Sequence, residues 1–476
     1  MFISRKFEES RADVWSTGSL NWHLIICYMA DNDGDFASTK LWSKQETKLM
    51  TINYFIGTMC LYSSRVALPI SNSVLSQTYG WNKSDAGTIM SCFFWGYTIT
   101  QIFAGKLADK YSGERILNIT TLAWALLTLF TPQLFDLAYW SGYPMFFLLL
   151  LRILTGIGQG FHSPSLASIV SKHLTATDKG RVFGICLAGS HFGSVVAGSL
   201  GSIILEAFGW RSLFYFVGKH FKCYLVVHLS LLDRKVNNTY GNRIAPADSK
   251  TTLNKAKGSE ASLLPLDKKK HTNDVDVPWK QLFSHPAFWA ASVAQYAGAN
   301  AYFTIFSWLP SYFSDHFPNS KGAIYNTVPY LAIVLSALVS PFIAARLISH
   351  GRSVTFTRKF MEGTSLVLAA LCLLAVSASS TFYAALLLFS LAMLARGLHH
   401  GGVSVNPLDF APNHTGSVFG IFNAFSAITG LVGVYVAGMI LHSTNDNWSL
   451  VWFSTSVQCV LGAIVYSMFG TGEKII

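Results

Sequence analysis

Twelve long apolar segments dominate the sequence and limit its fold more than any other feature. Each is long enough to cross the hydrocarbon core of a bilayer, which takes roughly 20 apolar residues in a helix. Only 12% of the 476 residues are charged and 51% are hydrophobic, which is too apolar for a soluble chain of this size. The segments lie at residues 48–70, 85–108, 116–135, 143–171, 181–206, 210–232, 286–313, 323–348, 359–378, 381–404, 415–441 and 449–469. The pattern predicts an all-α membrane protein with twelve transmembrane helices in two six-helix halves.

A polar stretch separates the two groups of six segments. Residues 233–279 are rich in Lys, Asp, Asn and Ser, which is typical of a flexible linker. This linker divides an N-terminal half at residues 48–232 from a C-terminal half at residues 280–476. Residues 1–47 form a polar N-terminal segment to which we assign no function. The layout of two six-helix halves predicts a substrate site between the halves, near the middle of the bilayer.

Lysine and arginine are distributed unevenly between the loops, although the net charge is +11. Basic residues concentrate in loops on one predicted side, and the loops on the other side carry few. By the positive-inside rule, both termini and the central linker are expected to be cytosolic. Because topology accounts for the charge, we expect no nucleic-acid partner. The seven cysteines stand singly, so neither a disulfide framework nor a metal site is expected.

The sixth segment is the least regular of the twelve. It carries Lys219, His220, Lys222 and His228 where apolar contacts are expected. Three interpretations remain open for it: a shortened helix whose basic ends reach the interface, a polar face that lines a cavity, or a local anomaly such as a mis-joined exon.

Arg152 lies deep within the fourth segment, next to closely spaced glycines that include Gly156 and Gly160. A charge at that depth costs about 2.5 to 3.5 kcal/mol on insertion scales. Such a charge usually faces an aqueous cavity and has a function there. We therefore expect Arg152 to face a central cavity, and we expect the glycines to allow close packing between helices.

The loop between the second and third segments reads Gly105-Lys-Leu-Ala-Asp-Lys-Tyr-Ser-Gly-Glu-Arg115. Gly105 can allow close helix approach, and Asp109, Lys110 and Arg115 can form pairs that break when two halves rock. The loop resembles the signature of the major facilitator superfamily, with one inserted residue. The corresponding stretch in the second half, at residues 340–346, lacks the acid and the glycine, so we expect an asymmetric gating pair.

Further motifs resemble the organic-anion branch of that superfamily, which holds the vesicular glutamate transporters, sialin and phosphate transporters. Within this branch the resemblance is greatest to the vesicular nucleotide transporters, and it extends from about residue 48 to residue 469. The motifs are Gly80-Trp-Asn, Ser91-Cys-Phe-Phe-Trp-Gly-Tyr-Thr-Ile-Thr-Gln101, Arg152-Ile-Leu-Thr-Gly, Phe306-Ser-Trp-Leu-Pro310, Arg358-Lys-Phe-Met and Ser404-Val-Asn-Pro-Leu-Asp-Phe-Ala-Pro412.

This resemblance implies a carrier of small anionic substrates, above all ATP and related nucleotides. It implies transport from the cytosol into secretory vesicles or lysosome-like organelles, with chloride as an activating ion. No metal or prosthetic group is expected as a cofactor, and we expect the chain to function as a monomer in the lipid bilayer. The sequence has no GxxxxGK[ST] phosphate-binding loop, so a nucleotide would be carried and not hydrolysed.

The resemblance also assigns the substrate-binding residues. It implies that Arg152 and Arg65 are essential arginines that clamp phosphate or carboxylate oxygens. Gln159 stands where proton-coupled members have a glutamate, and glutamine cannot titrate. The substitution predicts uptake driven by membrane potential. For a cargo with about four negative charges, 100 mV supplies roughly 9 kcal/mol.

Other candidate residues lie in the second half. Asn300 and Tyr302 can contact a base or sugar, with core packing as the alternative interpretation. His400 matches the nucleotide branch, whereas Arg396 is an addition of this chain. Arg396 can add positive potential to the cavity or pair at a helix interface, and the sequence does not decide between these roles.

Three polar residues lie near predicted ends of spans. Asn406 and Asp409 fit a family motif at the cytosolic end of the tenth span, and we interpret Asp409 as a gate or a helix cap. Asn82 begins a possible glycosylation sequon, Asn82-Lys-Ser84.

Three alternative functions remain. The first is a proton- or sodium-coupled carrier of phosphate, glutamate or sialate. The second is a transporter-like protein that carries nothing. The third, a membrane enzyme, is disfavoured because no arrangement of a nucleophile, a histidine and an acid is evident.

Overall fold

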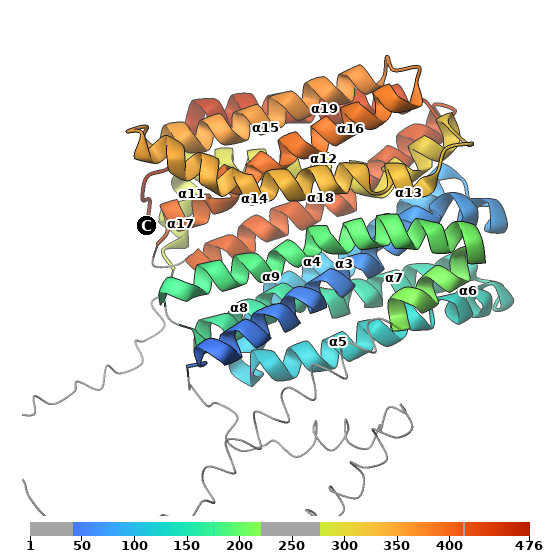
Figure 1. Cartoon of the computed structure of the whole chain (residues 1–476), viewed down its shortest axis with the longest axis horizontal. Coiled ribbons are helices and arrows are strands. Elements are labelled where there is room, and N and C mark those ends of the chain that lie inside the picture. Colours follow the sequence, from blue (N-terminus) through green and yellow to red (C-terminus); the bar gives the residue numbers. More distant parts are fainter. Residues whose placement is uncertain (1–40, 175, 220–276, 413–414) are drawn as a thin grey trace, which may run out of the picture.

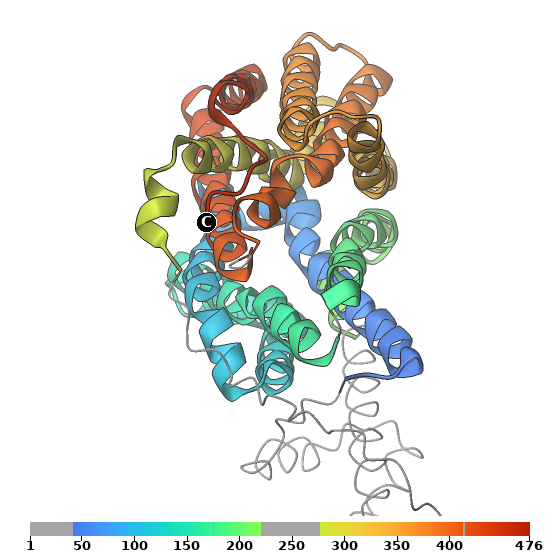
Figure 2. The same ribbon diagram turned by 90° about the vertical axis from the view of Figure 1, so that its left-hand side faces the viewer.

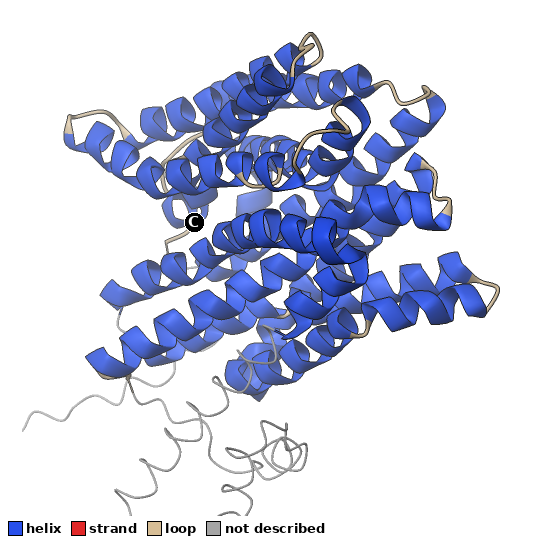
Figure 3. Ribbon diagram, turned by 45° about the vertical axis from the view of Figure 1, so that its right-hand side comes forward, coloured by secondary structure: helices blue, strands red, loops and turns tan. Residues whose placement is uncertain are grey.

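The computed structural model describes residues 41–174, 176–219, 277–412 and 415–476. All regular secondary structure within these ranges is helical (Figure 3). Most helices run roughly parallel to one long axis of the molecule, and the chain crosses back and forth along it (Figure 1). We call the end where Lys44 and the C-terminus lie the terminal face, and the end near Trp140 and His316 the opposite face.

The N-terminal half is built from seven numbered helices and a further helical stretch. A π-helical turn at Ala197–Gly201 follows α9, and residues 202–219 continue as helix, interrupted by a positive φ of 79° at Gly209. The helices are α3 (Lys44–Tyr79), α4 (Lys83–Tyr111), α5 (Gly113–Leu129), α6 (Thr131–Trp140), α7 (Pro144–Gly160), α8 (His162–His173) and α9 (Ala176–Val196).

The C-terminal half has a similar layout, with three short helices between the long ones. A pair of 3₁₀ turns, Leu398–Gly401 and Val403–Val405, separates α16 from α17. The helices are α11 (Trp279–Ser284), α12 (Pro286–His316), α13 (Gly322–Tyr325), α14 (Val328–Ser349), α15 (Val354–Val376), α16 (Phe382–Gly397), α17 (Asn406–Phe410), α18 (Thr415–Ser443) and α19 (Trp448–Phe469).

The helices coincide with the predicted apolar segments, but fewer than twelve pass a strict test for membrane spans. In the described residues, seven are long and apolar enough, or eight if α5 and α6, which meet at 60°, count as one bent span. The long helices α3, α4 and α12 pack among them (Figure 1) and are more polar. They bury groups such as Ser64, Arg65 and Asn300, because they face the interior of the protein more than lipid.

The sixth predicted span is described only as far as Lys219, which is exposed. His220, Lys222 and His228 lie outside the described residues. The three interpretations of this segment therefore remain open.

Glycines set the close approach of helices in the N-terminal half. A methyl group added at Gly156 would collide with the carbonyl oxygen of Phe93 on α4. One added at Gly193 on α9 would collide with the carbonyl oxygen of Met59 on α3. The contact at Gly156 confirms its predicted packing role, and Gly193 has the same role between α9 and α3.

The two halves meet along a central pair of helices, α4 and α18 (Figure 1). Viewed from the terminal face, the C-terminal half lies above the N-terminal half (Figure 2). Most polar contacts between the halves, among the described residues, lie toward the opposite face. They include a Lys83–Asp315 ion pair of 2.6 Å, an Asn72–Ser311 hydrogen bond of 3.0 Å, and a 2.9 Å bond from the Gly322 amide to Glu206. Nearer the terminal face, Asn423 of α18 donates to Gln101 of α4 at 2.9 Å.

Candidate functional site

Arg65 is buried at the middle of α3 and is held by a neutral partner. Its Nε donates to Oε1 of Gln159 on α7 at 2.7 Å. The amide nitrogen of Gln159 donates in turn to the hydroxyl of Ser64 at 2.7 Å. Gln159 is 1% exposed, so both ends of its amide are used within the protein. The guanidinium is thereby oriented without losing its positive charge.

Aromatic rings surround the same guanidinium. Its central carbon lies 4.5 Å from the ring centroid of Tyr62, 5.0 Å from that of Phe93 and 4.5 Å from that of Tyr97. Ring faces attract a cation more strongly where water is excluded. These contacts stabilise the charge of Arg65 and leave it available to an anion.

Arg152, on α7, shares Phe93 with Arg65. Its guanidinium carbon lies 5.2 Å from the centroid of the Phe93 ring, and its Nε is buried without a hydrogen-bond partner. Neither arginine forms a salt bridge among the described residues. Two uncompensated guanidiniums, one on α3 and one on α7, therefore meet at one aromatic ring.

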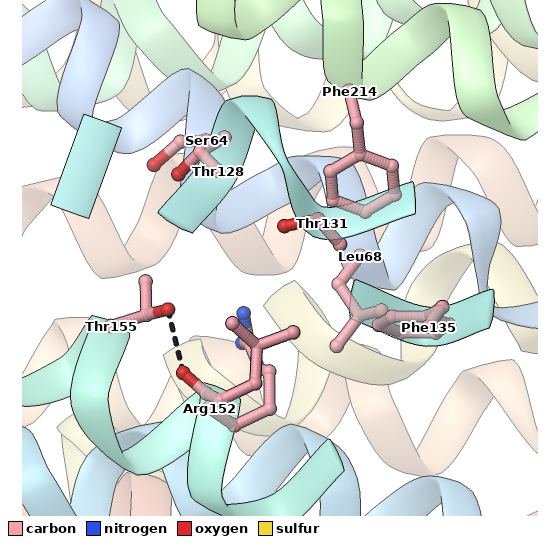
Figure 4. Close-up of a pocket in the computed structure, with 9 residues that line it drawn as sticks. Ser64, Leu68, Thr128, Thr131, Phe135, Arg152, Thr155 and Phe214 are labelled. Atoms are coloured by element: carbon pink, nitrogen blue, oxygen red, sulfur yellow. Dashed lines mark hydrogen bonds between the residues drawn. The ribbon is translucent and has the colours of Figure 1, made fainter. Parts of the chain in front are cut away.

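Two neighbouring cavities open around Arg152. The first lies within the N-terminal half. In Figure 4 the side chains of Ser64, Thr128 and Thr131 stand on the wall across from Arg152, with the ring of Phe214 above them. Hydroxyl groups beside a cation suit an anion or ordered water.

The second cavity lies between the two halves. Arg65 and Arg152 form part of its wall on the N-terminal side, and α12 of the C-terminal half supplies the facing part. Its lining residues are Tyr62, Arg65, Pro69, Met90, Phe93, Phe94, Arg152, Phe303, Phe306 and Ser307. The sequence predicted a cavity that contains both arginines, and the structure places them together there.

Arg396 is arranged differently. It is 3% exposed and its Nη1 lies 3.4 Å from Oε1 of Glu362 and 2.7 Å from the hydroxyl of Ser365. Glu362 is fully buried and also contacts Nδ1 of His399 at 2.9 Å. The sequence left two roles open for Arg396, and the structure shows the helix-interface pair. Nothing in the spacing of the sequence indicated Glu362, because its partners lie 34 and 37 positions away.

The remaining predicted substrate residues are Asn300, Tyr302 and His400, and Tyr302 packs against two rings that line the second cavity, with centroids 5.3 Å from Phe303 and 5.7 Å from Phe306. Asn300 donates to Gln458 at 3.1 Å and packs against Gly433, a position that favours core packing. Tyr302 and His400 both lie against His191 of α9, with ring centroids 6.4 and 5.5 Å from it. None of the three lines either cavity, and their substrate roles stay predictions.

The structure describes only some of the gating residues predicted in the loop at residues 105–115. Among the described atoms, nothing lies within 4 Å of a methyl group placed on Gly105, so the structure shows no close helix approach at that residue. Arg115 is exposed. The side chains of Asp109 and Lys110 lie outside the described residues.

The gating residues of the second half form defined contacts at the terminal face. Asp409 accepts two bonds from Arg358, at 2.8 and 3.3 Å. Arg358 was not assigned a role from the sequence, and it also donates to the carbonyl of Gly401 at 3.0 Å. Asn406 is fully buried, donates to the carbonyl of Thr471 at 2.6 Å and accepts from Tyr466. The two residues tie α17 to α15 and to the C-terminal segment.

Asn82 serves as the N-cap of α4. Its side-chain oxygen accepts from the amide of Asp85 at 2.8 Å, and Asp85 accepts from the Asn82 amide at 3.2 Å. This capping box gives the asparagine a structural role. Its glycosylation stays a prediction.

Comparison with known proteins agrees with this architecture. A family profile described as the Major Facilitator Superfamily matches residues 54–434. The "Voltage-gated purine nucleotide uniporter SLC17A9" of Rattus norvegicus is 35% identical over 92% of this chain and 93% of its own length. The protein of the same name from Homo sapiens is 34% identical, over 93% and 96%.

A solved structure shares the fold. It is the inward-facing, unoccupied form of a bacterial homolog to the human lysosomal transporter Spinster, with a TM-score of 0.68. The match covers 90% of this chain and 97% of that chain at 14% sequence identity. At this identity the likeness concerns the fold alone.

Proposed function

Because the chain belongs to the major facilitator superfamily and is a transporter and not an enzyme, we propose that it carries ATP and other purine nucleotides across a membrane by alternating access. Relatives more than 30% identical over nearly the whole chain bear the name of a purine nucleotide uniporter.

One observation carries the proposal: two free guanidiniums face one cavity between the halves. Arginine binds phosphate oxygens bidentately and keeps its charge at any physiological pH. Since no carboxylate pairs with Arg65 or Arg152 among the described residues, their positive charge is left for an anionic cargo. A nucleotide polyphosphate matches two adjacent cations better than a single carboxylate does.

The neutral partner of Arg65 supports membrane potential as the driving force. Gln159 occupies a position from which a carboxylate would form an ion pair with Arg65. A glutamine neither neutralises the arginine nor takes up a proton. The anion therefore moves with its charge largely uncompensated, and an inside-positive potential pulls it across.

The orientation follows from the loop charges. The positive-inside rule predicts that both termini and the linker at residues 233–279 are cytosolic, so we expect uptake to run from the cytosol into a secretory vesicle or lysosome-like organelle. The contacts at the opposite face, such as Lys83 with Asp315, would then close the luminal side. Activation by chloride and function as a monomer belong to the same proposal.

Uptake into proteoliposomes tests this function. The purified protein is reconstituted, and an inside-positive potential is imposed without a pH gradient. We expect labelled ATP to accumulate, and phosphate, glutamate and sialate to accumulate far less. Uptake of one of these three that requires a proton or sodium gradient, without uptake of ATP, would reject the proposal in favour of the alternative carrier.

A further inference from the structure

The cavity between the halves has its two cations on one wall and aromatic rings on both walls. The N-terminal wall carries Arg65 and Arg152, on α3 and α7, whose guanidiniums already pack on Tyr62 and Phe93. The facing wall lies on α12, where Phe303 and Phe306 are spaced so that both rings reach the same face of the helix. Ser307 adds a hydroxyl beside them. Among the described residues that line this cavity, the two arginines alone are charged.

A polyanion alone would use only the wall that carries the arginines. Phosphate, pyrophosphate or tripolyphosphate can be bound by guanidiniums and gains nothing from phenylalanine rings. A nucleotide has a second part, a flat aromatic base, which stacks well on such rings. The composition of the cavity therefore fits a ligand that joins a polyphosphate to an aromatic group.

The contact between Phe303 and Phe94 shows how a nucleotide base can enter the cavity between the halves. Phe303 meets the ring of Phe94 on α4 at a centroid distance of 4.7 Å and an interplanar angle of 69°. This edge-to-face contact joins the two halves. A base that displaces it exchanges one aromatic contact for another, so little apolar area is exposed in the exchange.

We propose that Phe303 and Phe306 form the base-binding surface for the nucleotide, with Ser307 as a hydrogen-bonding group at the edge of the base or ribose. This assignment rests on the proposed function. The phosphates bind the N-terminal half and the base binds the C-terminal half. A complete nucleotide therefore bridges the halves, whereas a polyphosphate without a base contacts one half only.

The test compares two ligands that differ by the nucleoside. The KM for ATP and the inhibition constant of inorganic tripolyphosphate against ATP uptake are measured for the wild type, Phe303→Leu and Phe306→Leu. Leucine keeps apolar volume but removes the stacking face. We expect each variant to raise the KM for ATP roughly 5- to 150-fold and to leave the inhibition constant of tripolyphosphate within about twofold.

Three further variants separate recognition from packing. Phe303→Tyr keeps a ring, so its KM for ATP should stay close to the wild-type value and well below that of Phe303→Leu. Ser307→Ala should raise the KM for ATP by a few fold at most. Phe360→Leu removes an exposed ring on α15, where it stacks only on Phe356 among the ring contacts of the described residues, and should change neither constant. Size-exclusion profiles check that each variant folds.

Two results would overturn the assignment. Equal losses for ATP and tripolyphosphate would show that the rings only support the cavity, and an unchanged KM in both leucine variants would show that the base binds elsewhere. A wild type that takes up no ATP at all would instead reject the proposed function, so the two failures are distinguishable.

Discussion

The two halves of the molecule surround their buried arginines with different partners, neutral groups in one half and a carboxylate in the other. In the N-terminal half, Arg65 is held by the neutral amide of Gln159, and Arg152 has aromatic and hydroxyl neighbours. In the C-terminal half, Arg396 is buried against the carboxylate of Glu362. The same side chain thus carries a charge without a carboxylate partner in one half and a compensated charge in the other.

This difference shows that a buried arginine is not by itself a binding site. An unpaired charge at this depth is costly and persists where something else benefits from it. A paired charge needs no ligand and can serve to join helices. We infer that the anion-binding charge resides in the N-terminal half, and that the C-terminal half contributes shape and apolar contacts.

Removing the carboxylate that pairs with Arg396 should have the largest effect, a loss of folding stability. Glu362→Gln leaves Arg396 buried without a counter-charge, which should lower the free energy of unfolding by about 3 to 5 kcal/mol. The loss is measured as a fall in the thermal unfolding midpoint of the purified protein in detergent. The double variant Glu362→Gln with Arg396→Met should recover much of this stability. An unchanged midpoint in the single variant would mean that the pair is not needed to compensate the charge.

Placing a carboxylate beside the arginine of the N-terminal half should have the next largest effect, a loss of ATP uptake. Gln159→Glu places a carboxylate on Arg65, and ATP uptake at neutral pH should fall about 10- to 100-fold, as expected for one charge-assisted phosphate contact. Protonation at acidic pH makes the carboxyl neutral, so uptake by this variant should rise as the pH falls. The measurement is the initial uptake rate at several pH values under one fixed potential. The neutral substitution Gln159→Asn is the control, and equal pH profiles for both variants would contradict the account.

Removing the Lys83–Asp315 ion pair between the halves should have the smallest effect on stability and on turnover. Asp315→Asn removes the ion pair with Lys83, whose side chain is 21% exposed, and should cost less than about 1 kcal/mol. We expect a change of at most a few fold in turnover, with the KM for ATP unchanged. The matched control is Asp136→Asn, which removes the exposed Asp136–Arg211 pair of 2.7 Å within one half. Equal effects of the two variants on turnover would show that the pair between the halves plays no part in the rocking motion.

The sequence predicted the parts of this arrangement that lie within single segments. Apolar runs located the helices, and the depth of Arg152 in one of them indicated a cavity, because a charge at that depth is costly unless it faces water or a partner. The bend between α5 and α6 was missed, since the segment at residues 116–135 reads as one continuous apolar run.

Contacts between distant segments could not be predicted. Glu362 lies in an apolar segment as conspicuously as Arg152 does, but only the packing of α15 against α16 shows that it compensates Arg396. Phe303 and Phe306 read as ordinary apolar residues of a span. Their place on the cavity wall depends on how α12 faces α3, α4 and α7, which no local pattern encodes.

Nucleotide uptake by Arg152→Ala tests the central claim most directly. Arg152→Lys is the matched variant, because it keeps the charge but loses the bidentate geometry. Under an imposed inside-positive potential and at equal expression, we predict background uptake for the alanine variant and partial uptake for the lysine variant. Full transport by Arg152→Ala would contradict the account, because it would show that the free charge of the N-terminal half does not bind the cargo.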